Sequence, residues 1–140
     1  MIHVALADDH PLVLDALGEL IDQQPDMVVV ARWTDGNAVV ENIGSVDCDV
    51  LVLDLSLPGA SGFGVLRALP DVAPTTRTLV YTMYPASLTR WGVLATGAKG
   101  WVCKREPPDA VIAGIRRIAT GDIEAPEPSP AEGLSPRQRE

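Results

Sequence analysis

Asp49-Val50-Leu51-Val52-Leu53-Asp54 contains a short apolar run that ends in a carboxylate, and it gives the clearest indication of the fold. An apolar run of this length is typical of a buried strand. A carboxylate directly after such a strand is costly unless a cation, hydrogen bonds or chemistry compensates it. Residues 2–7 form a second apolar run, and it ends in Asp8 and Asp9. Two hydrophobic strands that both end in acid predict one shared acidic pocket.

Strand-like and helical patterns alternate through most of the chain. We expect five strands and five helices, with each strand followed by a helix. The strands are expected at 2–7, 27–33, 50–53, 78–81 and 100–103, and the helices at 12–21, 37–43, 62–69, 88–96 and 110–119. Near-continuous apolar strands suit a parallel sheet that is covered on both faces, and the alternation implies right-handed crossovers. The pattern therefore predicts an α/β protein with a doubly wound (βα)5 architecture and a five-stranded parallel sheet.

The composition restricts the class of protein. The 140 residues are 46% hydrophobic, which is enough for one domain with a real core. The formal net charge of −8 and the pI of about 4.6 argue against nucleic-acid binding by these residues themselves. Cys48 and Cys103 form no CxxC or Cys/His cluster, and no apolar stretch is long enough to cross a membrane. We therefore expect reduced thiols in a cytoplasmic protein.

The character of the sequence changes after Thr120. Residues 121–133 carry three prolines among Glu, Ser and Ala, which predicts a semi-extended linker. Residues 134–140 follow with Ser135 and Pro136, a pair typical of the start of a helix. We therefore expect a domain at 1–120, a linker at 121–133 and the start of a further domain at 134–140, as in a piece of a longer protein.

Chemically active side chains follow four of the expected strands. Asp8 and Asp9 follow the first, Asp54 the third, Thr82 ends the fourth and Lys104 follows the fifth. Ligands of open α/β sheets bind beyond the carboxyl ends of the strands, so these groups are expected at one rim. Clustered carboxylates need a cation, and hard oxygen ligands suit Mg²⁺. A carboxylate can also attack phosphorus, and an ammonium and a hydroxyl can stabilise the transferring phosphoryl group.

These residues and their neighbours resemble the receiver domain of two-component response regulators, over about residues 1–120. The resemblance rests on Asp8-Asp9, on Leu53-Asp54-Leu55-Ser56-Leu57-Pro58-Gly59-Ala60-Ser61-Gly62, on Thr82 and on Gly97-Ala98-Lys99-Gly100-Trp101-Val102-Cys103-Lys104. Residues 134–140 resemble the opening of a LuxR/NarL-type helix-turn-helix output domain. The resemblance implies a flavodoxin-like receiver fold and a phosphorelay signalling protein rather than an enzyme.

The resemblance also implies a role for the acidic residues. Asp54 is the implied phosphoacceptor, taking its phosphoryl group from a phosphohistidine on a sensor histidine kinase. Asp9, Asp54 and the backbone carbonyl of Ser56 are the implied Mg²⁺ ligands, with Asp8 acting mainly through water.

Three further residues receive implied roles. Lys104 pairs with Asp54 and then with the phosphoryl oxygens. Thr82 moves inward to hydrogen-bond the phosphoryl group, and Trp101 occupies the position of the aromatic switch residue. Simpler interpretations remain beside these, with Thr82 as a helix cap and Trp101 as an aromatic of the edge strand.

Several other residues have ordinary structural interpretations. His10 is expected to cap or begin a helix rather than to bind metal, because Mg²⁺ prefers oxygen. Arg116 and Arg117 are expected on a solvated helix face, and both cysteines are expected to be small buried hydrophobes.

The leading hypothesis is a phosphorylation-dependent response regulator with DNA-binding transcriptional output through a further C-terminal domain. One alternative is a receiver that acts without phosphate, by dimerisation or ligand binding, which Met83 and Trp101 favour. Another is a Mg²⁺-dependent phosphatase of the haloacid dehalogenase type, although Ser56 stands where that chemistry needs a second Asp. Activation by homodimerisation is expected, either through the first and last helices or through the fourth helix, fifth strand and fifth helix.

Overall fold

The computed structural model describes residues 1–84 and 86–121. The elements follow one another as β1 (Ile2–Ala7), α1 (Pro11–Asp22), β2 (Met27–Trp33), α2 (Gly36–Asn42), the 3-10 helix η1 (Ile43–Ser45), β3 (Val50–Leu53), α3 (Gly62–Val72), β4 (Arg77–Thr82), α4 (Ala86–Thr96), β5 (Gly100–Cys103) and α5 (Asp109–Ala119). All strand pairings are parallel, and the strand order is β2-β1-β3-β4-β5. The predicted doubly wound, five-stranded parallel sheet is confirmed.

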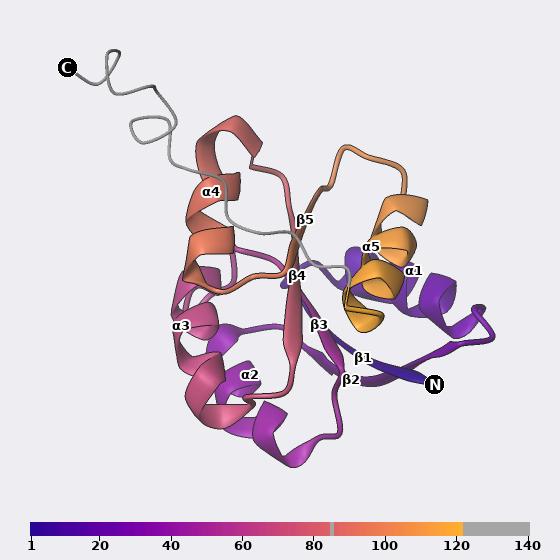
Figure 1. Ribbon diagram of the computed structural model, residues 1–140, viewed down its shortest axis with the longest axis horizontal. Coiled ribbons are helices and arrows are strands. Elements are labelled where there is room, and N and C mark those ends of the chain that lie inside the picture. The colour runs from indigo at the N-terminus through magenta and orange to yellow at the C-terminus, as the bar shows by residue number, and fades with distance from the viewer. Residues whose placement is uncertain (85, 122–140) are drawn as a thin grey trace.

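The helices form two layers on opposite faces of the sheet. α1 and α5 cover one face, and α2, α3 and α4 cover the other (Figure 1). From β1 the chain goes to β2 on one side, and from β2 it crosses back to β3 on the other side of β1. Such a reversal opens a crevice beyond the carboxyl ends of the central strands. The fold therefore places any ligand site above β1 and β3.

The central strands are apolar without alternation because both of their faces are buried. Val50 and Val52 point into the core beneath α1 and α5, whereas Leu51 and Leu53 point into the core beneath α2, α3 and α4. All four side chains are at most 3% exposed. Successive side chains of a strand point to opposite faces, so a strand covered on both sides must be apolar at every position. This explains the run that precedes Asp54.

One helix extends beyond its predicted end. The sequence predicts a helix over 62–69, but α3 continues through Pro70 to Val72. Proline lacks the N–H that continues the helical hydrogen bonds, and a helix usually ends before it. Here Pro70 is exposed while Leu69 and Ala73 are buried, at 5% and 7%. Burial of the apolar face outweighs the missing hydrogen bond.

Arg116 is partly exposed, at 43% of its side chain, and it also makes a specific contact that the sequence did not predict. Arg117 is exposed, as expected, but Arg116 reaches from α5 to the α1–β2 connection. Its Nε lies 3.0 Å from Asp26 Oδ2, and its Nη2 lies 3.1 Å from Asp26 Oδ1 and 2.8 Å from Gln24 Oε1. A two-pronged guanidinium–carboxylate pair has fixed geometry. Arg116 therefore ties the C-terminal part of α5 to the end of α1.

Other expectations have mixed outcomes. Cys48 is buried, as predicted, but Cys103 is only partly buried because it ends the edge strand. The predicted linker at 121–133, beyond Gly121, and the predicted helix start at 134–140 lie outside the described residues. No helix in the described part of the chain combines the length and apolar character needed to span a membrane.

The connection from β3 to α3 packs tightly behind Asp54. Gly59 has a φ of +74°, a backbone conformation that glycine adopts readily. At Gly62, a Cβ atom would lie 2.5 Å from the Cα of Leu55, so no side chain fits there without a backbone shift. Ser61 caps α3, its Oγ accepting a hydrogen bond from the N–H of Gly64 over 3.2 Å. The chain after Asp54 is thus held in one conformation.

We expect Gly62→Ala to lower the free energy of unfolding by about 2 kcal/mol, because the added methyl group overpacks against the Leu55 backbone. Gly64→Ala is the matched control in the same turn of α3. Its Cβ would meet Ser61 Oγ at an ordinary 3.6 Å. The control should be neutral or should stabilise by roughly 0.5–1 kcal/mol, since alanine favours helix over glycine. Urea unfolding of both variants measures the difference in the free energy of unfolding. Equal effects would show that the close contact between residue 62 and the Leu55 backbone does not destabilise Gly62→Ala.

Candidate functional site

The acidic residues of the site follow neighbouring strands of the sheet. Ala7 and Leu53 are paired in register at the ends of β1 and β3, and the N–H of Asp54 donates to the carbonyl of Ala7 over 2.9 Å. Asp8, the residue after Ala7, therefore lies beside Asp54. The side chains of Asp8 and Asp54 are 5% and 3% exposed. The predicted acidic pocket therefore forms at the carboxyl edge of the two central strands.

Lys104 supplies the positive charge of the pocket. It follows the edge strand β5, and its N–H donates to the carbonyl of Thr82 over 2.8 Å. Its Nζ lies 2.7 Å from Asp8 Oδ2 and 3.3 Å from Asp54 Oδ2, and its side chain is only 8% exposed. The sequence indicated a pairing with Asp54, but the shorter contact is with Asp8. Lys104 thus joins two carboxylates rather than one.

The buried charges shift the titration of their neighbours. Burial and then the charge of Asp8 raise the pKa of Asp54 above its ordinary value, although Lys104 opposes them. Burial lowers the pKa of Lys104, but hydrogen bonding to Asp8 and the charges of Asp54 and Asp8 raise it above its ordinary value overall. One ammonium does not neutralise two buried carboxylates and the adjacent Asp9. The pocket is electrostatically suited to a further cation.

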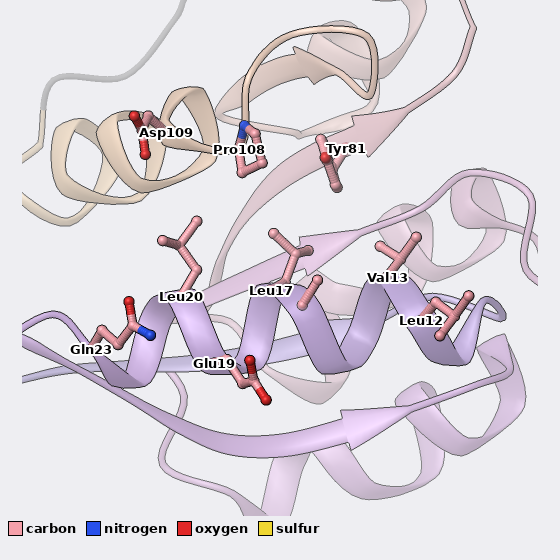
Figure 2. Close-up of a pocket in the computed structure, with 10 residues that line it drawn as sticks. Leu12, Val13, Leu17, Glu19, Leu20, Gln23, Tyr81, Pro108 and Asp109 are labelled. Carbon is pink, nitrogen blue, oxygen red and sulfur yellow. The ribbon is translucent and has the colours of Figure 1, made fainter.

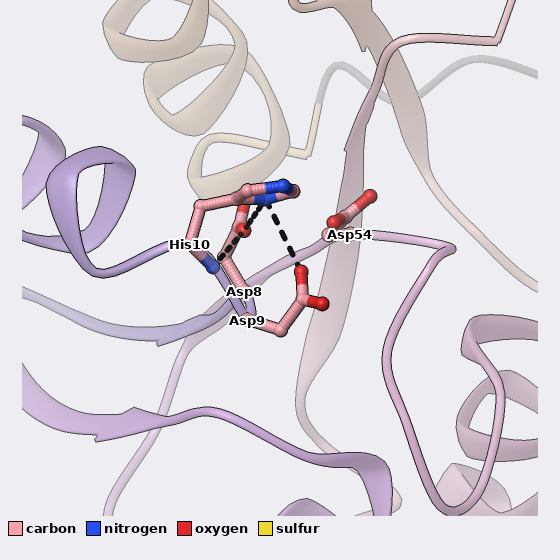
Figure 3. Close-up of side chains that lie close together, drawn as sticks. All are labelled: Asp8, Asp9, His10 and Asp54. Carbon is pink, nitrogen blue, oxygen red and sulfur yellow. Dashed lines mark hydrogen bonds and ion pairs between the residues drawn. The ribbon is translucent and has the colours of Figure 1, made fainter.

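Asp9 and His10 complete the cluster on its outer side. Asp9 is more open, with its side chain 35% exposed. The Nδ1 of His10 lies 2.8 Å from Asp8 Oδ1 and 3.1 Å from Asp9 Oδ1, and Figure 3 shows these contacts. His10 is the N-cap residue of α1, as expected, but its side chain makes no capping hydrogen bond. Its ring contacts the carboxylates instead.

The ligand atoms present fit a divalent cation. Asp8, Asp9, His10 and Asp54 each offer one atom, and these atoms all lie within 4.8 Å of one another. Most are carboxylate oxygens, the ligand type that Mg²⁺ prefers. Ser56 is nearby, since its N–H donates to Asp54 Oδ1 over 3.3 Å. Use of the Ser56 carbonyl as a ligand stays a prediction.

Thr82 and Trp101, the two residues with an implied switching role, lie on the neighbouring strands β4 and β5. Thr82 ends β4 and is completely buried, and its Oγ1 accepts a hydrogen bond from the N–H of Tyr84 over 3.3 Å. Within residues 1–84 and 86–121, no hydrogen bond joins the Thr82 hydroxyl to Asp54 or Lys104. Trp101 lies in β5, 8% exposed, in the same core cluster as Val80. Trp101 is therefore an inward-facing aromatic of the edge strand, and its switching role is not tested by this arrangement.

Comparison with known proteins places this chain in a family. Residues 4–116 match the response regulator receiver domain family. The chain belongs to this family.

Individual relatives agree with this assignment of the receiver domain. This chain is 32% identical over 120 residues to the oxygen regulatory protein NreC of Staphylococcus haemolyticus, and the match covers 85% of this chain and 55% of that protein. NreC of Staphylococcus aureus strain JH9 is 33% identical over the same shares. The chain thus spans about half the length of these curated relatives.

Solved structures share the fold of the receiver domain. A LuxR-family two-component response regulator from Aurantimonas sp. SI85-9A1 has a TM-score of 0.82 at 28% identity, covering 94% of each chain. The isolated receiver domain of RcsB from Salmonella enterica serovar Typhimurium, with the phosphomimetic BeF3⁻, has a TM-score of 0.81 at 28% identity. That comparison covers 96% of this chain and 99% of the RcsB chain. The resemblance of this chain to receiver domains of response regulators is confirmed.

Sequence reasoning missed Tyr81, which lies between the receiver's charged site and a groove. Its ring centroid is 5.7 Å from Lys104 Nζ, within reach of a cation–π interaction. Burial raises the pKa of its hydroxyl. The same residue lines a groove of about 540 Å³ between α1 and α5, together with Leu12, Val13, Leu17, Leu20 and Pro108 (Figure 2). The sequence could have indicated this position, because Tyr81 directly precedes Thr82. Neighbouring residues of a strand point to opposite faces, so Tyr81 should point away from the face of Thr82.

We expect Lys104→Met to lower the free energy of unfolding of the receiver domain at pH 7 by about 3 kcal/mol, because it leaves buried carboxylates without their partner. Lys99→Met is the matched control, because Lys99 lies at the opposite end of β5 and is only partly buried. Denaturant unfolding measures both. Equal losses would mean that the ion pairs of Lys104 contribute nothing specific.

The pH dependence has a defined sign. The pKa of Lys104 is raised in the folded state, so its stabilisation is fully present below the ordinary lysine pKa and is lost as the pH rises through the folded value. In Lys104→Met the pKa of Asp54 rises further, because the opposing ammonium is gone. The variant should therefore regain stability as the pH falls towards the acidic range, more than the unmodified protein does.

Proposed function

We propose that this chain accepts a phosphoryl group on Asp54 from a phosphohistidine of a sensor histidine kinase, as the receiver of a transcriptional response regulator. The observation that carries the proposal is the placement of Asp54. Its carboxylate is 3% exposed, lies 3.3 Å from Lys104 Nζ, and adjoins Asp8 and Asp9 at the carboxyl edge of the sheet. A buried carboxylate beside a lysine and further acids suits phosphoryl transfer better than structural support alone.

The geometry holds the nucleophile before the reaction. Oδ1 of Asp54 accepts from the Ser56 N–H, and Oδ2 pairs with Lys104, so both oxygens have fixed positions. A carboxylate oxygen attacks phosphorus, the P–N bond to the kinase histidine breaks with its electron pair leaving on nitrogen, and an acyl phosphate forms. Lys104 then pairs with the phosphoryl oxygens. Mg²⁺, when bound by Asp8, Asp9, Asp54 and the Ser56 carbonyl, supplies charge neutralisation for the transferring group.

The site favours a signalling domain over a phosphatase that turns over external esters. Ser56 occupies the position two residues after the nucleophile, where haloacid dehalogenase chemistry needs a carboxylic acid. The hydroxyl of Ser56 has no acidic proton to give to a leaving group at neutral pH. The domain in this proposal catalyses only its own phosphorylation and dephosphorylation.

We propose Thr82 and Trp101 as the residues that relay the phosphorylated state. The Thr82 hydroxyl now accepts from the Tyr84 N–H, and turning it towards a phosphoryl group breaks that bond. Met83 and Tyr84 beside it are 53% and 48% exposed, so a shift of this segment changes the surface. Trp101 would follow by filling the space that Thr82 leaves.

Output through DNA is the remaining part of the proposal. RcsB, which is 27% identical to this chain over 86% of this chain and 62% of the RcsB chain, has been solved bound to promoter DNA in the presence of BeF3⁻. For this protein we propose a receiver at residues 1–120, a linker at 121–133 and an output domain that begins at 134–140. The charge of −8 would repel DNA phosphates, so DNA contact belongs to the output domain. The proposed location is the cytoplasm.

Incubating the chain with Mg²⁺ and a small acyl phosphate should add one phosphoryl group, detected as an increase in intact mass. Asp54→Asn should abolish the increase, because the amide is not a nucleophile towards phosphorus. Asp49→Asn is the matched control, an Asp at the other end of β3 that should leave the increase unchanged.

An unchanged mass for the unmodified protein, with the fold intact, would contradict the proposal. It would favour the alternative of a receiver that works without phosphate. Operator binding by the whole protein that is equally tight with and without phosphorylation would lead to the same conclusion.

We propose that the active form is a homodimer through α1 and α5. Leu12 on α1 is 83% exposed at the mouth of the α1–α5 groove. Exposed Asp15 and Glu19 lie on α1, and exposed Arg117 lies on α5. A two-fold axis would place α1 of one copy against α5 of the other, bringing these opposite charges together.

Leu12→Asp should weaken dimerisation in the presence of beryllofluoride at least about tenfold, because it places a charge in the apolar centre of this face. Trp91→Asp tests the alternative face, since Trp91 is 37% exposed on α4. Sedimentation velocity across a concentration series measures both. Loss of the dimer in Trp91→Asp alone would assign the interface to α4, β5 and α5.

A further inference from the structure

The His10 side chain contacts the acidic cluster and does not cap α1. Its ring makes no capping contact with α1, and its Nδ1 lies instead between carboxylate oxygens of Asp8 and Asp9, at 2.8 and 3.1 Å. These two carboxylates are also expected metal ligands. The same imidazole nitrogen therefore points to the place where their oxygens converge.

The backbone holds this arrangement in place. His10 precedes Pro11, and a residue before proline is restricted to extended conformations. Its φ of −98° and ψ of 107° satisfy that restriction. Its N–H donates to Asp8 Oδ1 over 2.9 Å, so the same oxygen that contacts the ring also holds the main chain. Local geometry thus holds the main chain of His10 beside the carboxylates, while the exposed ring keeps some freedom to adjust.

The distances permit one ion to reach all four side chains. One atom each from Asp8, Asp9, His10 and Asp54 lies within 4.8 Å of the others. Bonds of about 2.1 Å to a divalent transition metal place opposite ligands roughly 4.2 Å apart, so only small side-chain adjustments are needed. The His10 side chain is 59% exposed, which leaves it free to make such an adjustment.

We propose that His10 is a metal ligand of this site through Nδ1, and that it gives the site a preference for Mn²⁺, Co²⁺ and Zn²⁺ over Mg²⁺. Imidazole nitrogen suits first-row transition metals, whereas Mg²⁺ prefers oxygen ligands only. The inference deepens the proposed function by assigning the metal class of the same site. Metal binding by His10 is measured without a phosphodonor. Failure of phosphoryl transfer to Asp54 and failure of nitrogen ligation are therefore separate results.

The direct test is pulsed electron paramagnetic resonance of the Mn²⁺-loaded, tag-free protein. Coupling of the Mn²⁺ electron spin to ¹⁴N is expected, and labelling with [¹⁵N]histidine should replace it by ¹⁵N coupling. His10→Gln should remove the signal. His3→Gln should retain it, because His3 lies with Asp47 and Asp49 at the opposite end of β1. The labelled protein keeps the test valid even if His10→Gln folds poorly.

Calorimetric titration gives the second readout. His10→Gln should weaken Zn²⁺ and Co²⁺ binding more than about tenfold and change Mg²⁺ binding by less than about threefold. Absence of nitrogen coupling in the unmodified protein would overturn the proposal, as would its persistence in His10→Gln. Equal weakening for Mg²⁺ and Zn²⁺, or tighter Mg²⁺ binding in the variant, would likewise show that His10 covers the carboxylates without ligating the ion.

Discussion

The ammonium of Lys104 lies between two buried carboxylates, 2.7 Å from Asp8 and 3.3 Å from Asp54, and the arrangement of the site depends on it. These three residues follow β1, β3 and β5, which are not all neighbours in the sheet. β4 lies between β3 and β5, and its last residue, Thr82, accepts the N–H of Lys104. Lys104 therefore contacts residues at the ends of β1, β3 and β4 and itself follows β5, the next strand in the sheet. A change in the charge of Asp54 therefore alters an ion pair that connects the ends of these four strands.

Tyr81 connects this charge to the α1–α5 face. Its ring lies 5.7 Å from Lys104 Nζ and also lines the groove together with Leu12 and Pro108. Thr82, the next residue, belongs to the charged edge itself. Adjacent residues of β4 thus face opposite sides of the sheet, and the strand provides a short physical route between the proposed phosphorylation site and the proposed dimer face.

The sequence was informative wherever one strand or one strand end carried the signal. Val50–Leu53 and Ile2–Ala7 were predicted to the residue because a strand buried on both faces is apolar throughout. The convergence of Asp8, Asp54 and Lys104 followed from parallel topology. What could not be predicted depends on packing between distant elements. Arg116 contacts Asp26, which is 90 residues away in the sequence. Pro70 remains within α3 because its neighbours are buried. Neither outcome can be predicted from a local sequence pattern.

The unequal contacts of Lys104 bear on how a phosphoryl group could be accommodated. The shorter bond, to Asp8, does not involve the proposed phosphoacceptor and would persist if Asp54 were modified. Only the longer bond to Asp54 has to be exchanged for one to a phosphoryl oxygen. The Thr82 hydroxyl is in a similar position, because the bond it would give up, from the Tyr84 N–H, is a neutral contact of 3.3 Å. A phosphoryl oxygen is a charged acceptor and makes a stronger hydrogen bond with a hydroxyl than a neutral pair does. Each rearrangement thus gives up a contact of 3.3 Å, and the short Asp8–Lys104 pair would keep the strand ends in place meanwhile.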